Sequence, residues 1–197
     1  MALSLEEARH ALRERQGLGA RYDCEEAPAS DLSLARLGTA YFARKLNELT
    51  DAQLDLPSRL PNWSRRHLIA DICYQARRLA RLMEAARQGR SEERLDEPDA
   101  QIEDVDFGAS LPARALRNLF YHAQIHLNVE WRDLDAAGWQ ASIRSLRGDV
   151  VAIRQTPIMR AQAIWVAAVN LGNGASARDF PQALVRRLGE GSGPAAK

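Results

Sequence analysis

Asp71 and Gln75 are polar residues in an otherwise apolar stripe, and they are the first candidates for chemistry in this sequence. The stripe recurs at intervals of three and four residues, as the buried face of a helix does, and consists of Leu68, Asp71, Gln75, Leu79 and Leu82. An ionised carboxylate in such a face is unfavourable unless it is paired. Asp71 is therefore expected to pair with a buried arginine, to meet water because the stripe is slightly rotated, or to border a polar cavity as an acid, base or ligand.

Small residues mark one face of the segment that begins at Pro157. The residues on this face are Met159, Ala163, Val166, Ala167 and Asn170. Two alanines are small for a face that meets other long helices, so they either let the helices approach closely or leave a cavity. The sequence alone leaves both alternatives open.

The other residues with reactive side chains favour structural roles. His122 and His126 are spaced so that two imidazoles could share one metal ion, but no third ligand accompanies them. Ordinary half-buried histidines are the simpler interpretation. Cys73 lies on a different helical face from Asp71 and has no base beside it, so we expect a core residue. The tryptophans are interpreted as packing residues: Trp63, Trp131, Trp139 and Trp165.

The elements that must position these residues are almost all helices, so the predicted fold class is all-α. Helices are expected at 3–15, from about 30 to 49, 64–88, 111–134 and 157–171, with a short one after Pro181. Ser30 or Asp31 is a candidate cap for the second of these helices, and Asn62 or Ser64 for the third. Three helices of about 20 residues and a fourth of about 15, joined by long crossovers, predict a four-helix bundle.

Three further features of the elements are open to test. The buried stripe of the helix at 30–49 is approximated by Leu34, Leu37, Tyr41, Leu46 and Leu49. Residues 89–110 are acidic and without period, which indicates a solvated loop rather than a binding surface. Residues 141–156 predict a small hairpin, in which Ile143–Leu146 pairs with Val150–Arg154.

The composition agrees with one globular domain. Of 197 residues, 27 are Lys or Arg, 26 are Asp or Glu and 46% are hydrophobic. Near-zero net charge argues against a nucleic-acid partner, and the lack of a long uncharged apolar run predicts no membrane span. Two cysteines without a signal peptide fit a cytoplasmic location. We expect one domain at 1–188, including an N-terminal helix and loop at 1–29, and a flexible tail at 189–197.

Several motifs resemble a known family over roughly residues 30 to 182. They are Leu34–Thr39 (LARLGT), Leu60–Ala70 (LPNWSRRHLIA), Ala115–Leu119 (ALRNL) and the segment from Met159 to Gly172. In this order they resemble the mycothiol-dependent maleylpyruvate isomerases of the DinB-like superfamily. The resemblance implies a DinB-type four-helix bundle with long crossovers.

The resemblance also implies a metal site whose ligands this sequence lacks. Family members hold one divalent metal, usually zinc, through two histidines and a glutamate, and use a low-molecular-weight thiol. The matching positions here are Asp71, Ala163 and Ala167, while Gln162 and Asn170 stand where the family has an arginine and an aspartate. One carboxylate alone cannot hold zinc, which needs three or four ligands. We therefore predict no metal and no other cofactor, in a sequence that ends before the second domain of longer members.

Three functions are compatible with a family scaffold that keeps its flanking motifs and loses its ligands. In the first, an enzyme uses the emptied metal cavity for metal-free acid–base chemistry on a small molecule. Asp71 would be the base or orienting group and Gln75 its hydrogen-bonding neighbour, with pocket walls at Leu34, Gly38, Ala163, Ala167 and Asn170. In the second, the protein binds a ligand or is structural; in the third, it is a thiol-dependent isomerase or transferase. Natural divergence and deliberate redesign would leave the same trace in the sequence.

Overall fold

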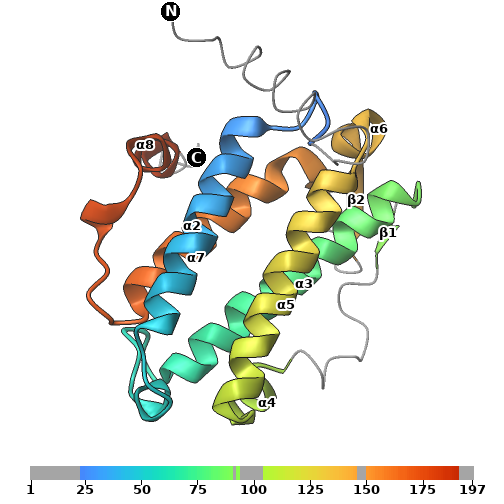
Figure 1. Ribbon diagram of the computed structural model, residues 1–197. Coiled ribbons are helices and arrows are strands. Elements are labelled where there is room, and N and C mark those ends of the chain that lie inside the picture. The colour runs from blue at the N-terminus through green and yellow to red at the C-terminus, as the bar shows by residue number, and fades with distance from the viewer. Residues whose placement is uncertain (1–22, 91, 94–103, 146–149, 191–197) are drawn as a thin grey trace, which may run out of the picture.

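Four long helices dominate the computed structural model, which describes residues 23–90, 92–93, 104–145 and 150–190. They are α2 (Ala29–Asn47), α3 (Arg65–Arg87), α5 (Ala113–Asp133) and α7 (Thr156–Asn170). The helices form two pairs, α2 with α7 and α3 with α5, and α3 also contacts α7 (Figure 1). The prediction of an all-α four-helix bundle is confirmed, and each long helix begins and ends within two residues of its expected bounds.

Short helices connect and flank the bundle. They are η1 (Ala52–Asp55), α4 (Val105–Ser110), α6 (Ala136–Gln140), η3 (Ile153–Gln155), η4 (Ala177–Asp179) and α8 (Gln182–Glu190). The last of these confirms the short helix expected after Pro181. The prediction of a loop throughout 89–110 is wrong at α4, where the Asp104 side chain accepts a hydrogen bond from the Asp106 amide and Gly108 packs against Tyr74 of α3.

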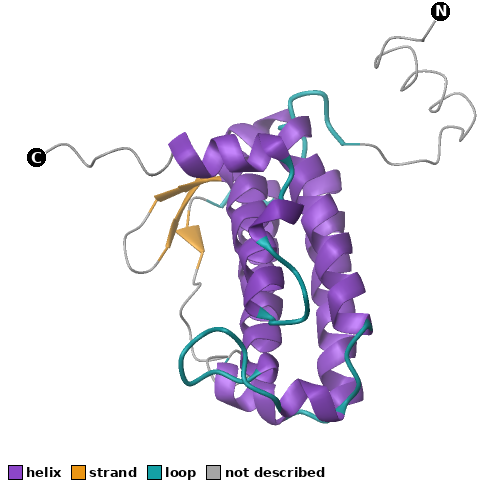
Figure 2. Ribbon diagram, turned by 90° about the vertical axis from the view of Figure 1, so that its left-hand side faces the viewer, coloured by secondary structure: helices purple, strands orange, loops and turns teal. Residues whose placement is uncertain are grey.

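A small sheet lies near one end of the long helices (Figure 2). Strand β2 (Ser142–Ser145) pairs antiparallel with β3 (Val150–Ala152), with Ile143 opposite Val151, so the predicted hairpin is confirmed. It is shorter than expected because the chain turns into η3 at Ile153. The sequence analysis missed β1 (Glu92–Glu93), which adds to β2 in parallel.

The helix ends follow capping chemistry at α3 but not at α2. Ser64 caps α3 in a reciprocal capping box with His67, as one of the two expected caps. Asn62 instead adopts a positive φ in the preceding turn. Neither Ser30 nor Asp31 caps α2, because both lie inside the helix after Pro28; the buried Asp31 carboxylate pairs with Arg187 of α8 at 3.1 Å.

The buried face of α2 differs from the predicted stripe. Leu34, Leu46 and Leu49 are buried as expected, whereas Leu37 is 53% exposed and Tyr41 is only half-buried. The core face is instead formed by Leu32, Leu34, Ala35, Gly38, Phe42 and Leu46. Gly38 and Ala35 carry no strong hydrophobic pattern in the sequence, which is why the prediction is wrong at Leu37 and Tyr41.

Two expectations fall outside the part of the chain that the structure describes, namely the helix at 3–15 and most of the tail at 189–197. Residues 189 and 190 belong to α8. Within the described residues, none of the helices combines the length and the apolar character needed to cross a membrane.

Candidate functional site

Asp71 lies at the edge of the buried face of α3 and is half-buried. The centre of that face is formed by Ile69, Cys73, Ala76 and Ala80, so the buried face is slightly rotated from the predicted stripe. Among the described residues Asp71 makes no hydrogen bond or ion pair. Burial raises the pKa of its carboxyl, and the positive charges of Arg78 and Arg160 oppose that rise.

Arg160 is the ionised group that faces this part of α3 from α7. Its guanidinium is 1% exposed, and Nη1 donates to the carbonyl of Ile72 and to Oε1 of Gln75, at 2.8 Å each. Gln75 was expected beside Asp71; its side chain instead accepts a hydrogen bond from Arg160. Desolvation lowers the pKa of Arg160 to about 10, which leaves it charged at neutral pH. Sequence reasoning did not assign Arg160 a role, although it is the one charged residue in α7.

The small residues of α7 lie on its less buried side. Ala167 is buried and Ala163 and Asn170 are half-buried, while Met159 and Val166 on the same face are exposed. The backbone carbonyl of Asn170 accepts a hydrogen bond from the amide of Arg59. This face therefore runs from the buried core at Ala167 to exposed residues at Met159 and Val166.

Leu34 and Gly38, both proposed as pocket walls, meet Trp165 of α7. Nε1 of Trp165 donates to the Leu34 carbonyl at 3.1 Å, and a Cβ at Gly38 would lie 2.6 Å from the same nitrogen. These two residues give a close α2–α7 approach at Trp165. The choice between close approach and a cavity, raised for Ala163 and Ala167, stays open. Neither residue lines either of the two cavities described next.

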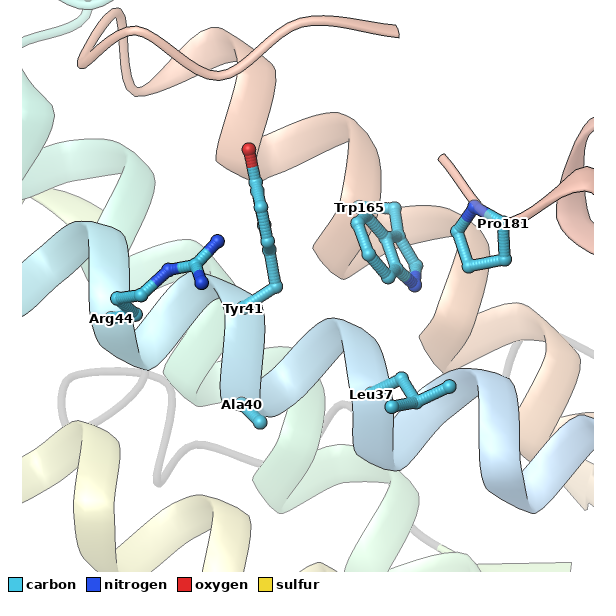
Figure 3. A pocket seen from close by; sticks show the side chains of 6 residues that line it. All are labelled: Leu37, Ala40, Tyr41, Arg44, Trp165 and Pro181. Atoms are coloured by element: carbon cyan, nitrogen blue, oxygen red, sulfur yellow. The ribbon is translucent and has the colours of Figure 1, made fainter. Parts of the chain in front are cut away.

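One cavity lies between α2 and α7, and another lies between α2 and α5. The α2–α7 cavity, of about 320 Å³, is bordered by Leu37, Ala40, Tyr41, Arg44, Trp165 and Pro181 (Figure 3). The α2–α5 cavity, of about 550 Å³, is lined by four residues of α2, seven of α5 and Arg160 of α7. Asp71 and the two alanines line neither cavity, so the predicted pocket around Asp71 stays a prediction.

The remaining candidates occupy structural positions. Cys73 is fully buried, and burial raises the pKa of its thiol to about 12. His122 and His126 are exposed rather than half-buried, and His126 lies 3.4 Å from Glu130. Of the tryptophans, Trp131, Trp139 and Trp165 are buried in the core. Nowhere in the described residues do three histidine, cysteine or acidic side chains gather as a metal site would require.

The fold and the retained motifs define the class as a DinB-like helical bundle. The chain belongs to the family of mycothiol maleylpyruvate isomerase N-terminal domains, whose model matches residues 35–172. A similar solved structure is that of the mycothiol-dependent maleylpyruvate isomerase, with 35% identity and a TM-score of 0.75 over 81% of this chain and 67% of that chain. A variant of that enzyme with one histidine replaced by alanine matches equally well. None of the curated proteins compared with this chain matches it.

The donor set at the three positions that the resemblance assigns to the family's metal ligands does not fit a zinc ion. Asp71 offers carboxylate oxygens, whereas Ala163 and Ala167 offer only methyl groups. The cationic Arg160 nearby also opposes a second positive charge. These positions therefore supply too few donor atoms for the metal of the family.

Proposed function

We propose that this chain is a metal-independent relative of the maleylpyruvate isomerases that transfers a proton to and from a small organic molecule through Asp71. The observation that carries the proposal is the state of this carboxyl at the position of a family metal ligand. It is half-buried, unbonded to any described residue and shifted to a higher pKa by burial. A carboxyl with a raised pKa is a stronger base than an exposed aspartate and holds its proton closer to neutral pH.

The surrounding charges suit a proton acceptor. Arg160 and Arg78 favour the ionised form of Asp71, which must be present before a proton can be abstracted. In the proposal, Gln75 positions the Arg160 guanidinium on which this charge depends. Ala163, Ala167 and Asn170 would leave room beside Asp71 for the substrate, and Leu34 and Gly38 would support that wall through Trp165.

A second candidate function is ligand binding without chemistry, which the position of the α2–α5 cavity favours. That cavity contains Arg160 but not Asp71. A molecule held there would be bound by the guanidinium without reaching the carboxyl. Thiol-dependent isomerisation, the activity named for the similar enzyme, is the third candidate.

Turnover of maleylpyruvate by the purified chain, measured with and without mycothiol and with a chelator, separates these functions. The proposal predicts turnover that survives the chelator and falls by about 100-fold or more in Asp71→Asn, the contribution of a positioned general base. Asp106→Asn, which changes an exposed carboxylate paired with His67, is the matched control and should keep its rate.

Each remaining outcome identifies another function. Equal rates in the parent chain and Asp71→Asn would contradict acid–base chemistry at this residue. An absolute requirement for mycothiol would favour the third candidate. Saturable binding without any turnover would identify a binding protein.

The pH profile gives a second check on Asp71. Only the ionised carboxylate can abstract a proton, so activity should be constant above its raised pKa and fall as the pH drops through that value. The acid limb should be absent from any residual activity of Asp71→Asn. An unchanged acid limb in that variant would assign the titration to another group.

A further inference from the structure

Arg160 is a buried cation without a carboxylate partner. Its guanidinium is almost fully buried, and it forms no ion pair with any described residue. Nη1 is satisfied by Ile72 and Gln75, but Nη2 is buried and has no hydrogen-bond partner among the described residues. An unpaired buried charge is unfavourable, and an unsatisfied buried donor adds to that cost.

Arg160 is one of the residues that line the α2–α5 cavity. The cavity's volume of about 550 Å³ lies within the range of small-molecule sites, which runs from about 300 to 1,000 Å³. Thr39, Gln124 and Asn128 supply polar groups to its lining, while Ala43 and Trp131 supply apolar surface. The cavity thus combines apolar and polar surface with one buried positive charge.

The arginines that line the cavity leave one positive charge for a bound anion. Two further arginines line it, and both already have carboxylate partners. Arg36 holds Asp23 through two hydrogen bonds of 2.6 and 2.7 Å, and Arg132 holds Asp133 at 3.1 Å. No acidic residue is part of the lining. Arg160 is therefore the one arginine of the lining that forms no hydrogen bond or ion pair with a carboxylate of the described residues, and Asp71 acts on it only through its charge.

We propose that the α2–α5 cavity binds a small organic monocarboxylate, whose carboxylate accepts a hydrogen bond from Nη2 of Arg160 and whose apolar part lies between α2 and α5. The anion would satisfy both the charge and the unpartnered donor. This site goes beyond the acid–base function proposed above, because it does not include Asp71 and does not depend on turnover.

Calorimetric titration of the purified chain with benzoate and hexanoate, and with the corresponding neutral amides, tests the site. Ionic strength is held constant, and inorganic phosphate serves as a compact anion without an apolar part. We expect each acid to bind once per chain and at least about tenfold more tightly than its amide, as a charge-assisted hydrogen bond requires. Acids that bind no better than their amides, or phosphate that binds as well as the acids, would overturn the proposal.

Three variants locate the binding. Arg160→Met should remove the preference for acid over amide, with folding checked by thermal unfolding because Arg160 joins α7 to α3. Ala43→Leu keeps the guanidinium and fills the cavity, so it should weaken acids and amides alike by about tenfold or more. Arg44→Met removes the same charge from α2 beside the α2–α7 cavity and should leave binding unchanged. Unchanged acid binding in Ala43→Leu, or in a folded Arg160→Met, would place the ligand elsewhere.

The two proposals fail independently. Asp71→Asn removes the proposed acid–base group but leaves Arg160 and the cavity lining in place, so carboxylate binding should persist. Loss of benzoate binding in a folded Asp71→Asn variant would show that the anion site depends on Asp71 and would overturn its assignment to the α2–α5 cavity.

Discussion

At the scale of single residues, burial determines what the ionisable side chains of the bundle can do. Asp71 and Arg160 both lie on helix faces that remove them from water at least in part. Burial raises the pKa of Asp71 and lowers that of Arg160, which favours the neutral form of each. Arg160 stays charged at neutral pH and needs partners. Asp71 keeps part of its solvent contact, which lets its carboxylate remain ionised without a hydrogen-bonding neighbour.

Asp71→Asn should stabilise the folded chain at neutral pH. Burial raises the folded pKa of Asp71 above its unfolded value, so the folded state binds the proton more tightly and stability declines as the pH rises through that interval. Asparagine has no such penalty, so the free energy of unfolding of the variant should be higher. The gain should be less than about 1 kcal/mol, because solvent partly screens the side chain. Urea unfolding at pH 7.5 should show the gain, which should disappear below about pH 4, where both states carry the proton. A variant less stable than the parent chain at pH 7.5 would contradict this account.

The two cysteines should differ sharply in reactivity. Cys73 is fully buried with a pKa of about 12, so almost no thiolate forms at pH 8, whereas Cys24 is only partly buried. A thiol reagent that is followed by absorbance should modify one cysteine per folded chain and the second only after unfolding. In Cys24→Ser, the rapid phase should be absent; its persistence would mean that Cys73 is accessible.

At the scale of elements, α2 and α7 approach closely because Gly38 has no side chain. A Cβ there would fall within 2.8 Å of Trp165 and Ile164 atoms, so Gly38→Ala should destabilise the chain by about 1–3 kcal/mol despite the better helix propensity of alanine. Gly189→Ala in α8 meets nothing within 4 Å and is the matched control. Denaturant unfolding should show a loss in the first variant and none in the second. Equal stabilities would mean that Trp165 moves without cost.

Arginines tie the ends of the long helices to their neighbours. Arg65 at the start of α3 donates to the carbonyls of Leu171 and Gly172 at the end of α7, and Arg117 of α5 donates to the carbonyls of Leu46 and Leu49. Arg65→Lys keeps the charge but cannot reach these acceptors together, so it should destabilise the chain by about 1–3 kcal/mol. Arg178→Lys is the control for the same exchange, since no hydrogen bond joins the Arg178 side chain to the described residues. Thermal unfolding distinguishes the two.

At the scale of the whole molecule, the bundle could be predicted because its elements carry local signals. Strong periodicity and the Ser64, Pro112 and Gly172 boundaries fix the long helices to within two residues. The face of α2 could only partly be placed, because Gly38 gives no hydrophobic signal although Trp165 and Ile164 pack closely against it. Strand β1 pairs in parallel with a segment about 50 residues away, which no local pattern reveals.

The candidate site shows the same division between local and distant information. Asp71 could be identified from the sequence because it and Gln75 interrupt a local apolar stripe. The α2–α5 cavity could not be predicted, because it depends on how helices from distant parts of the sequence pack together. Arg160 could have been noticed, because it is the one charged residue of α7. The predicted loss of metal donors at Ala163 and Ala167 rests on the resemblance to the family pattern, because no local signal in the sequence marks these alanines as ligand positions.

Zinc content tests the central claim most directly, namely that Asp71, Ala163 and Ala167 occupy the metal-ligand positions and have lost metal binding. The parent chain and a variant carrying Asp71→His, Ala163→Glu and Ala167→His are incubated with zinc, dialysed and analysed for bound metal. We predict substoichiometric zinc in the parent chain and one ion per chain in the triple variant. Stoichiometric zinc in the parent chain that Asp71→Ala removes, or a folded triple variant without zinc, would contradict the claim.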